Sequence, residues 1–209
     1  MIDKLKKLGN IPITVDILKT VISDYNAFSN KLARMVEEEK LIHLKKDLYL
    51  VSPQITGLKF SEGLIANHIY APSYVSLLTA LRIYGIIPER VETIQSMTLK
   101  KSWETRNETG CYTYTKCKKD YFNIGITYKN EAGVSYMIAS PEKALSDLVA
   151  YTTGVNIRFL KTAGKYLTED MRMEVEDLRN MDIAILKQCM QYSKKKESLF
   201  NIIKFIEKL

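Results

Sequence analysis

Four polar side chains near the N-terminus have the types and the spacing of a helix face that reads DNA. They lie opposite the apolar side chains of one predicted helix and are Ser29, Asn30, Lys31 and Arg34. Asparagine can pair bidentately with adenine and arginine with guanine, so Asn30 and Arg34 could read base edges. Lys31 is better suited to a phosphate group, as are Lys45 and Lys46 further along the chain.

The same residues have a simpler interpretation, which is a solvated helix face and a polar turn. Glu37, Glu38 and Glu39 follow directly. Three carboxylates at that end of the helix would repel a duplex unless the end tilts out of the groove. The residue types alone leave both interpretations open.

A second basic group falls in the middle of the chain, where the pattern predicts strands. Its five members are Lys100, Lys101, Lys116, Lys118 and Lys119. Four aromatic residues are interleaved with them, namely Trp103, Tyr112, Tyr114 and Tyr121. Basic and aromatic side chains together can hold phosphates and stack bases, so this is a candidate surface for nucleic acid or a protein partner. Strands rich in Thr, Tyr and Lys are equally typical of any half-exposed sheet.

A carboxylate–lysine group, Glu142, Lys143 and Asp147, raises the hypothesis of a metal-dependent nuclease. Glu142 and Asp147 are five residues apart, which turns them ~140° away from each other on an α-helix. We therefore expect the two carboxylates not to converge. Glu142 and Lys143 should lie outside, while the apolar side chains of this helix pack on a sheet.

The sequence holds no other pattern typical of catalysis or metal binding. It lacks a Gly-rich phosphate loop, an HExxH string and a nucleophile elbow. The two histidines, His43 and His68, have no neighbouring cysteine at ligand spacing. His68 lies on an apolar-leaning face, which favours a hydrogen-bonded core histidine. We expect no catalytic residue, no metal and no cofactor.

Apolar periodicity in residues 13–52 predicts the elements that must position the first group. Ile13, Ile17, Leu18, Val21 and Ile22 mark one face of a helix over 13–23. Asp24–Asn26 should form a short turn, and a second helix capped by Asn26 or Ser29 should follow. Residues 41–52 read as a β-hairpin with Lys45 and Lys46 at its tip. Together these form a winged helix-turn-helix over residues 1–54, whose second helix would enter the major groove.

The rest of the chain predicts a second domain over residues 60–209. A helix should run from Ser61 to Tyr70, and another should begin at Pro72 and end at Gly85. Strands are expected, as an antiparallel meander, at Val91–Lys100, Cys111–Cys117, Tyr121–Tyr128 and Val134–Ala139. Helices should resume at Pro141 and continue over 155–164, 168–180, 182–193 and 195–208. The predicted fold class is α+β, with a helical tail.

Composition is ordinary for a soluble globular protein, with 46% apolar and 26% charged residues. A net charge of +7 permits a polyanionic partner without requiring one. Three cysteines, an odd number, favour a reducing compartment. The longest apolar run is too short to span a bilayer. We expect a cytoplasmic protein with no membrane partner.

Two strings carry a resemblance to a known family. Residues 72–89 read PSYVSLLTALRIYGIIPE and residues 139–148 read ASPEKALSDL, with Thr93, Thr98 and Gly110 between them. Behind a winged helix-turn-helix, this order resembles the AbiEi family, the antitoxin and repressor half of type IV toxin–antitoxin operons of abortive infection. The resemblance covers most of residues 1–150.

The resemblance implies a non-enzymatic phage-defence antitoxin that represses its own operon. Its DNA partner would be operator DNA with inverted repeats, and it would counter a nucleotidyltransferase-type toxin either directly or indirectly. One departure concerns a stretch that is arginine-rich in the family. Here it reads Leu99–Lys100–Lys101–Ser102, which keeps the charge but loses the bidentate geometry of arginine.

Two other functions remain compatible with the sequence. One is an enzyme that acts on nucleic acid or on the toxin through the C-terminal domain. The other is a plain transcription factor with a ligand-sensing domain. A neighbouring gene for a nucleotidyltransferase would favour the antitoxin over the plain transcription factor.

Overall fold

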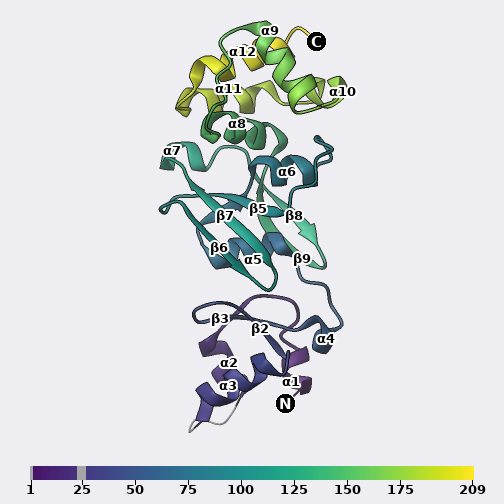
Figure 1. Ribbon diagram of the computed structural model, residues 1–209, viewed down its shortest axis with the longest axis vertical. Helices are drawn as coiled ribbons and strands as arrows, with labels where there is room; N and C mark the ends of the chain where they lie inside the picture. The colour runs from purple at the N-terminus through teal and green to yellow at the C-terminus, as the bar shows by residue number, and fades with distance from the viewer. Residues whose placement is uncertain (1, 23–26) are drawn as a thin grey trace.

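The computed structural model describes residues 2–22 and 27–209. Three tiers follow one another along the long axis, as Figure 1 shows: a small N-terminal unit, a layer built on a six-stranded sheet, and a layer of helices at the C-terminal end. The protein is therefore a mixed α/β protein with a helical tail. The turn predicted at Asp24–Asn26, and Asn26 as a helix cap, lie outside the described residues.

The N-terminal unit combines short helices with a three-stranded antiparallel sheet of order β1-β3-β2. Its elements are α1 (Ile2–Lys6), β1 (Ile13–Thr14), α2 (Val15–Val21), α3 (Phe28–Glu37), β2 (Leu41–Lys45), β3 (Leu48–Val51) and α4 (Pro53–Thr56). The predicted hairpin is present, with Leu41 opposite Val51. Leu5, Leu18, Leu32 and Met35 pack with the sheet in a core of this unit's own.

The larger sheet has the strand order β6-β7-β5-β4-β9-β8. Its strands are β4 (Ser73–Val75), β5 (Thr93–Thr98), β6 (Trp103–Asn107), β7 (Gly110–Lys116), β8 (Ile126–Glu131) and β9 (Val134–Ala139). The β4–β5, β6–β7 and β8–β9 pairs are antiparallel, whereas β4–β9 and β5–β7 are parallel. The predicted antiparallel meander is therefore wrong. The strand β6 connects β5 to β7, and the helix α7 (Lys119–Phe122) connects β7 to β8.

The strands β4 and β6 were not predicted from the sequence, and the strand predicted at Tyr121–Tyr128 is instead the helix α7 followed by β8. A helix was expected to begin at Pro72, but Ser73, Tyr74 and Val75 form a strand between β5 and β9. All three side chains are buried, so the strand shows no alternation of apolar and polar residues. The helix α6 (Leu77–Ile83) starts five residues later than predicted. It ends as expected, with Gly85 in the left-handed conformation at φ 75°.

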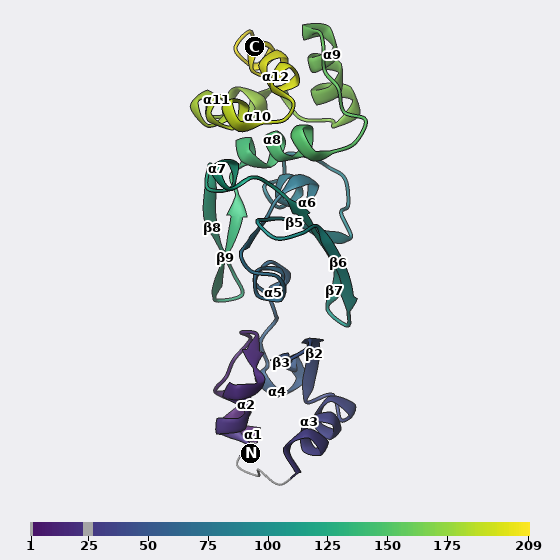
Figure 2. The same cartoon turned by 90° about the vertical axis from the view of Figure 1, so that its left-hand side faces the viewer.

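Helices cover the sheet from two sides. The helix α5 (Glu62–Ile69) lies in the concave side between the β8–β9 and β6–β7 pairs, whereas α6 and α8 (Pro141–Tyr151) lie on the other side (Figure 2). The hydroxyl of Ser61 caps α5 by accepting a hydrogen bond from the Leu64 N–H at 3.2 Å, at the position predicted for a helix start.

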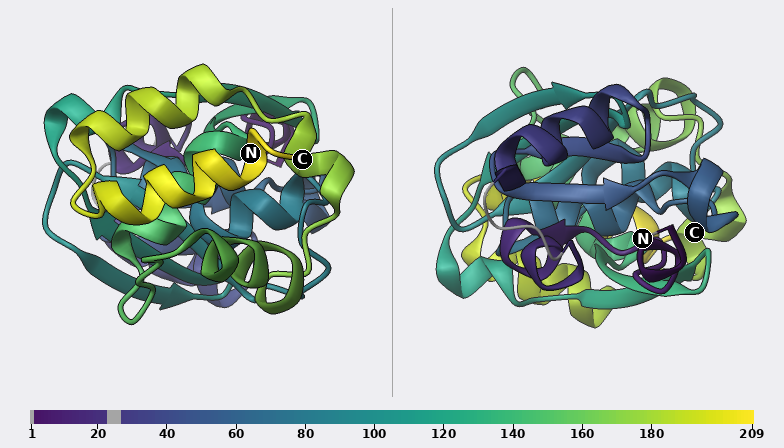
Figure 3. Two further views of the ribbon diagram at one scale, coloured as in Figure 1. Left: turned by 90° about the horizontal axis from the view of Figure 1, so that it is seen from above. Right: turned by 90° about the horizontal axis from the view of Figure 1, so that it is seen from below.

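The all-helical tail is present as predicted, but it is more broken. It comprises α9 (Leu160–Lys165), a π-helical turn η2 (Tyr166–Asp170), α10 (Val175–Arg179), α11 (Ile183–Tyr192) and α12 (Lys196–Ile206). Seen from above, α11 and α12 lie across the top of the sheet layer (Figure 3, left). None of the helices in the described part of the chain is long and apolar enough to cross a membrane.

The N-terminal unit is docked on the sheet layer through its hairpin. Leu44, Leu48 and Leu50 belong to the main hydrophobic core rather than to the core of their own unit. Polar contacts surround these leucines. The Asn107 amide donates to the Leu44 carbonyl at 2.9 Å, and the Asn10 amide donates to the carbonyls of Lys59 and Ala132 at 2.8 and 3.0 Å. The hairpin is thus packed on both faces.

Candidate nucleic-acid interface

The helix α3 presents its polar face at the end of the molecule farthest from the helical tail. Leu32 and Met35 are buried, while Asn30 and Arg34 are exposed on the opposite side of the helix. Figure 3, right, shows α3 lying open across this end. The structure therefore brings together the two side chains that were predicted to read bases. Ser29 is also exposed, and Lys31 is half-buried.

Arg34 is held by a local ion pair. Its Nε donates to Glu38 Oε1 at 2.7 Å, and Lys40 Nζ donates to Glu38 Oε2 at 2.5 Å. The hydrogen bonds from Lys40 and then Arg34 lower the pKa of Glu38. Exposed ion pairs contribute little free energy, so Arg34 can exchange Glu38 for another hydrogen-bond acceptor at small cost. The two cations also neutralise Glu38, which reduces the repulsion expected from the three glutamates.

The two hairpin lysines do not share one environment. Lys46 is exposed in the turn, as a phosphate contact requires. Lys45 is half-buried, and its Nζ donates to the Ile69 carbonyl at the end of α5, at 2.6 Å. Burial, and then the nearby charge of Lys100, lower the pKa of Lys45. Lys45 therefore fastens the hairpin to the sheet layer instead of projecting with Lys46.

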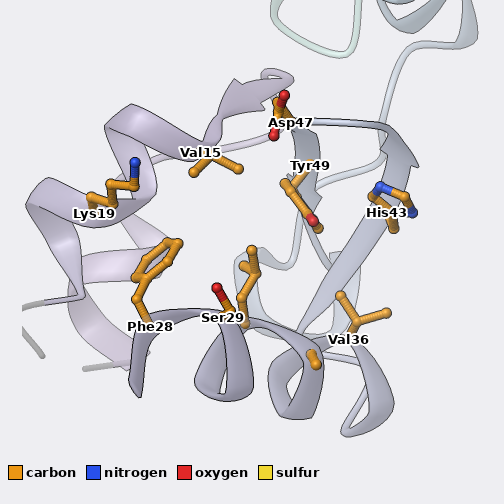
Figure 4. Close-up of a pocket in the computed structure, with 10 residues that line it drawn as sticks. Val15, Lys19, Phe28, Ser29, Val36, His43, Asp47 and Tyr49 are labelled. Carbon is orange, nitrogen blue, oxygen red and sulfur yellow. The ribbon is translucent and has the colours of Figure 1, made fainter. Parts of the chain in front are cut away.

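A pocket of about 580 Å³ opens between α2, α3 and the hairpin, as Figure 4 shows. Ser29 lines this pocket with Lys19, His43, Asp47 and Tyr49. Lys19 Nζ lies 3.3 Å from Asp16 Oδ1, and the rings of His43 and Tyr49 are 4.9 Å apart. The sequence placed Ser29 on the predicted DNA-facing side of the helix and gave no signal for Lys19 or Tyr49, because only the tertiary fold brings α2 and β3 beside α3.

The five lysines of the strand region gather at one edge of the larger sheet. Parallel pairing of β5 and β7 sets Thr98 opposite Lys116, so the segments that follow both strands leave from the same edge. The Lys116 N–H donates to Ser102 Oγ at 2.9 Å, which ties β7 to the β5–β6 loop that carries Lys100 and Lys101. Lys118 and Lys119 begin α7 next to it and are exposed.

The aromatic residues predicted to accompany these lysines divide into two groups. Tyr112, Tyr114 and Tyr121 are at most 2% exposed and belong to the core. Trp103 is 40% exposed and packs on Tyr70, with ring centroids 5.0 Å apart. Lys100 Nζ lies 5.1 Å from the Tyr70 ring centroid. Trp103 and Tyr70 are therefore the rings that this edge can offer to a partner.

The group Glu142, Lys143 and Asp147 is buried, which corrects the prediction that Glu142 and Lys143 lie outside. Lys143 and Asp147 are each 0% exposed and Glu142 is 7% exposed. The cause is that α8 is covered by the sheet on one side and by the helical tail on the other, so nearly all of its side chains are enclosed. Sequence reasoning treated the charges as a mark of exposure, which fails for a helix in a central layer.

Lys143 and Asp147 form a buried ion pair, in which Asp147 Oδ2 is hydrogen-bonded and Oδ1 has no hydrogen-bond partner among the described residues. Lys143 Nζ lies 3.3 Å from Asp147 Oδ1 and donates to the Tyr121 carbonyl at 2.8 Å. Asp147 Oδ2 accepts from Tyr74 Oη at 3.1 Å and from Ser76 Oγ at 2.6 Å. The two strings of the family resemblance thus meet at this pair.

The buried Lys143–Asp147 pair is suited to a structural role. Burial, and then the charge of Asp147, raise the pKa of Tyr74 well above its usual value, so this hydroxyl stays a donor. Glu142 points elsewhere and accepts from the Asp182 N–H at 3.0 Å, so the prediction that Glu142 and Asp147 do not converge is confirmed. Among the described residues, no three His, Cys, Asp or Glu side chains are grouped to hold a metal ion.

His68 is the remaining residue singled out by the sequence, and its expected core position is wrong. Its side chain is exposed at the end of α5, with Nδ1 3.0 Å from the Leu64 carbonyl. The apolar side chains beside it in sequence pack inward, while His68 itself lies just beyond that face.

No model of a protein family matches this chain, and a search of curated proteins finds no match either.

Proposed function

We propose that the protein is a DNA-binding repressor of its own operon that also acts as an antitoxin against a nucleotidyltransferase-type toxin. The observation that carries the DNA-binding half is the exposed polar face of α3 with Asn30 and Arg34, supported on its inner side by Leu32 and Met35. The order α1-β1-α2-α3-β2-β3, with a β1-β3-β2 sheet, supports a winged helix-turn-helix.

In this proposal α3 enters the major groove of the operator. Asn30 pairs with an adenine and Arg34 leaves Glu38 to pair with a guanine, while Lys46 contacts a phosphate. Lys45 is left out of the DNA contacts because its ammonium is bonded to Ile69. Two copies on an inverted repeat would place half-sites one or a few helical turns apart, ~34 Å for each turn.

The antitoxin half is assigned to the sheet edge and needs no catalytic residue. An enzyme that transfers nucleotides handles metal ions and phosphates with acidic side chains, so a basic edge with Lys100, Lys101 and Lys116 has the complementary charge. Trp103 and Tyr70 add partly exposed ring surface at the same edge. The resemblance of the two buried strings to AbiEi proteins supports the same assignment.

Binding to the promoter tests the repressor half. Fluorescence anisotropy should give a tighter complex with the DNA upstream of the gene than with a shuffled duplex of equal length and salt. Lys46→Ala should weaken both complexes and flatten the salt dependence by about one unit. Lys161→Ala, the same charge change on the exposed side of the tail, is the control and should leave both unchanged. Equal affinity for promoter and shuffled duplex would contradict the proposal.

Growth rescue tests the antitoxin half with the full-length chain. The toxin is the product of the neighbouring gene, expressed from an unrelated promoter so that repression plays no part. Changing the five edge lysines to Glu should abolish rescue. The same change at Lys161, Lys165, Lys187, Lys194 and Lys204, which are exposed lysines of the helical tail, should preserve it. Rescue by a folded edge variant would rule out this surface.

A further inference from the structure

A small polar pocket lies in the sheet layer, away from α3 and from the basic edge. It measures about 300 Å³, is lined by residues of α5, β4, α6, β5, β8 and β9, and opens to solvent beside the exposed Glu62 and Glu131. Its polar side chains are Glu62, Thr79, Arg82, Lys129, Glu131 and Tyr136. Such a volume is at the lower end of the range for small-molecule sites.

The charges in this pocket are not paired with one another. Arg82 Nε is buried and has no hydrogen-bond partner among the described residues. Among the residues that the structure describes, neither Glu62 nor Lys129 forms an ion pair within 4.0 Å. Burial raises the pKa of Glu62; the charge of Arg82 opposes this shift, and the smaller effect of Glu131 adds to it. A buried arginine donor without an acceptor is costly unless a ligand supplies one.

The walls that carry these charges are fixed before any ligand arrives. Ser61 Oγ donates to Glu131 Oε2 at 2.5 Å. Lys129 Nζ lies 5.5 Å from the ring centroid of Tyr84. Tyr136 is 2% exposed and its ring passes over Gly63, where a Cβ would lie 2.3 Å from Tyr136 Cε2. A preformed site loses little conformational entropy on binding.

We infer that this pocket binds a small zwitterion of amino-acid size, whose carboxylate lies at Arg82 and Lys129 and whose ammonium lies at Glu62 and Glu131. Arginine and lysine donate charge-assisted hydrogen bonds to a carboxylate, and two glutamates accept them from an ammonium. A phosphate dianion would meet the two glutamates, and a simple amine would meet the two cations. Only a ligand that carries both charges satisfies all four side chains.

Calorimetry and thermal shift on the full-length protein test this site without DNA or toxin, so the result does not depend on the proposed function. The probes are the standard free amino acids at millimolar concentration, with acetate, methylammonium and inorganic phosphate as single-charge controls. At least one amino acid should bind and raise the melting temperature, while each single-charge control should bind more weakly or not at all.

The matched variants assign the binding to this pocket. Arg82→Gln and Glu131→Gln should each weaken binding of the selected amino acid about ten- to a hundred-fold, as expected for losing a charged hydrogen bond. Glu131→Gln keeps an acceptor for Ser61, so folding is preserved if Arg82→Gln proves unstable. Arg158→Gln, on an exposed segment of the tail, should change nothing.

Three results would overturn the inference. They are no binding by any free amino acid, binding of acetate or phosphate as tight as that of the amino acid, and unchanged affinity in a folded Glu131→Gln variant.

Discussion

Two ion pairs with the same sequence spacing have opposite surroundings in this molecule. Arg34 on α3 with Glu38 at the C-cap of that helix, and Lys143 with Asp147 on α8, are both basic–acidic pairs separated by four residues. The side chains of the first pair are 75% and 32% exposed, whereas those of the second are 0% exposed. The spacing alone places the partners within reach on any helix. The layer in which the helix lies decides what the pair contributes.

This difference follows from the way the two helices are packed. On α3 one face contacts its own small core and the other meets solvent, so Arg34 can change partner at little cost. On α8 the charges have left water completely. Tyr74 and Ser76 donate to Asp147 Oδ2 and the Tyr121 carbonyl accepts from Lys143, whereas Asp147 Oδ1 has only the Lys143 charge, at 3.3 Å, beside it. The first pair is suited to an adaptable contact, the second to holding two layers together.

The largest expected effect comes from removing one partner of the buried pair. Asp147→Ala should lower the free energy of unfolding by about 3–5 kcal/mol, because it leaves the Lys143 charge buried without a counter-ion. Urea denaturation followed by circular dichroism measures this. Glu38→Ala, the equivalent change in the exposed pair, should cost far less, because an ion pair open to solvent contributes little to stability. Equal losses for the two variants would remove the distinction between the pairs.

A smaller loss is expected when one hydrogen bond to Asp147 is removed. Ser76→Ala should cost about 1.5–3 kcal/mol, the range for a bond to a charged group. The Ser76 side chain makes no capping bond to α6, so the loss reports on Asp147 alone. Ser96→Ala is the control, because its buried hydroxyl has no partner among the described residues. A Ser76→Ala loss no larger than that control would show that Asp147 does not need this donor.

The helix ends and the exposed face of α3 could be predicted from the sequence. Local signals were sufficient for the cap at Ser61, the helix from Pro141 and the left-handed Gly85, because each depends on a few neighbouring residues. The exposed face of α3 was predicted from the buried Leu32 and Met35 in the same way.

Features that depend on the stacking of layers could not be predicted. The strand β4 is buried between two other strands, and Lys143 is enclosed between the sheet and the tail. In both cases the local pattern indicates a different structure from the one that long-range packing imposes. Lys45 was misplaced for the same reason, since its partner Ile69 is 24 residues away in sequence.

Under the proposed function, the affinity for operator DNA tests whether the exposed Arg34–Glu38 pair can change partner. Arg34→Ala should cost about 1–3 kcal/mol of binding to the operator and relax the preference at one base pair. Glu38→Gln should strengthen operator binding slightly, because Arg34 no longer leaves a charged partner. Anisotropy titrations on operator and single-base variants measure both. A uniform loss for Arg34→Ala across all sequences would make Arg34 a phosphate contact.

The smallest expected effect is the acid response of the exposed pair. The hydrogen bonds from Lys40 and Arg34 lower the pKa of Glu38 below its ordinary value of 4.5 in the folded protein. A lowered folded-state pKa adds stability above the unfolded pKa, and this contribution is lost as pH falls through the folded value. The melting temperature of wild-type protein should therefore exceed that of Glu38→Gln slightly at neutral pH. The two should converge once the pH falls below the folded-state pKa. Salt should reduce the difference at neutral pH, because the pair is open to solvent. A difference that persisted at low pH and in high salt would mean that Glu38 acts through packing, and the pair on α3 would then resemble the one on α8.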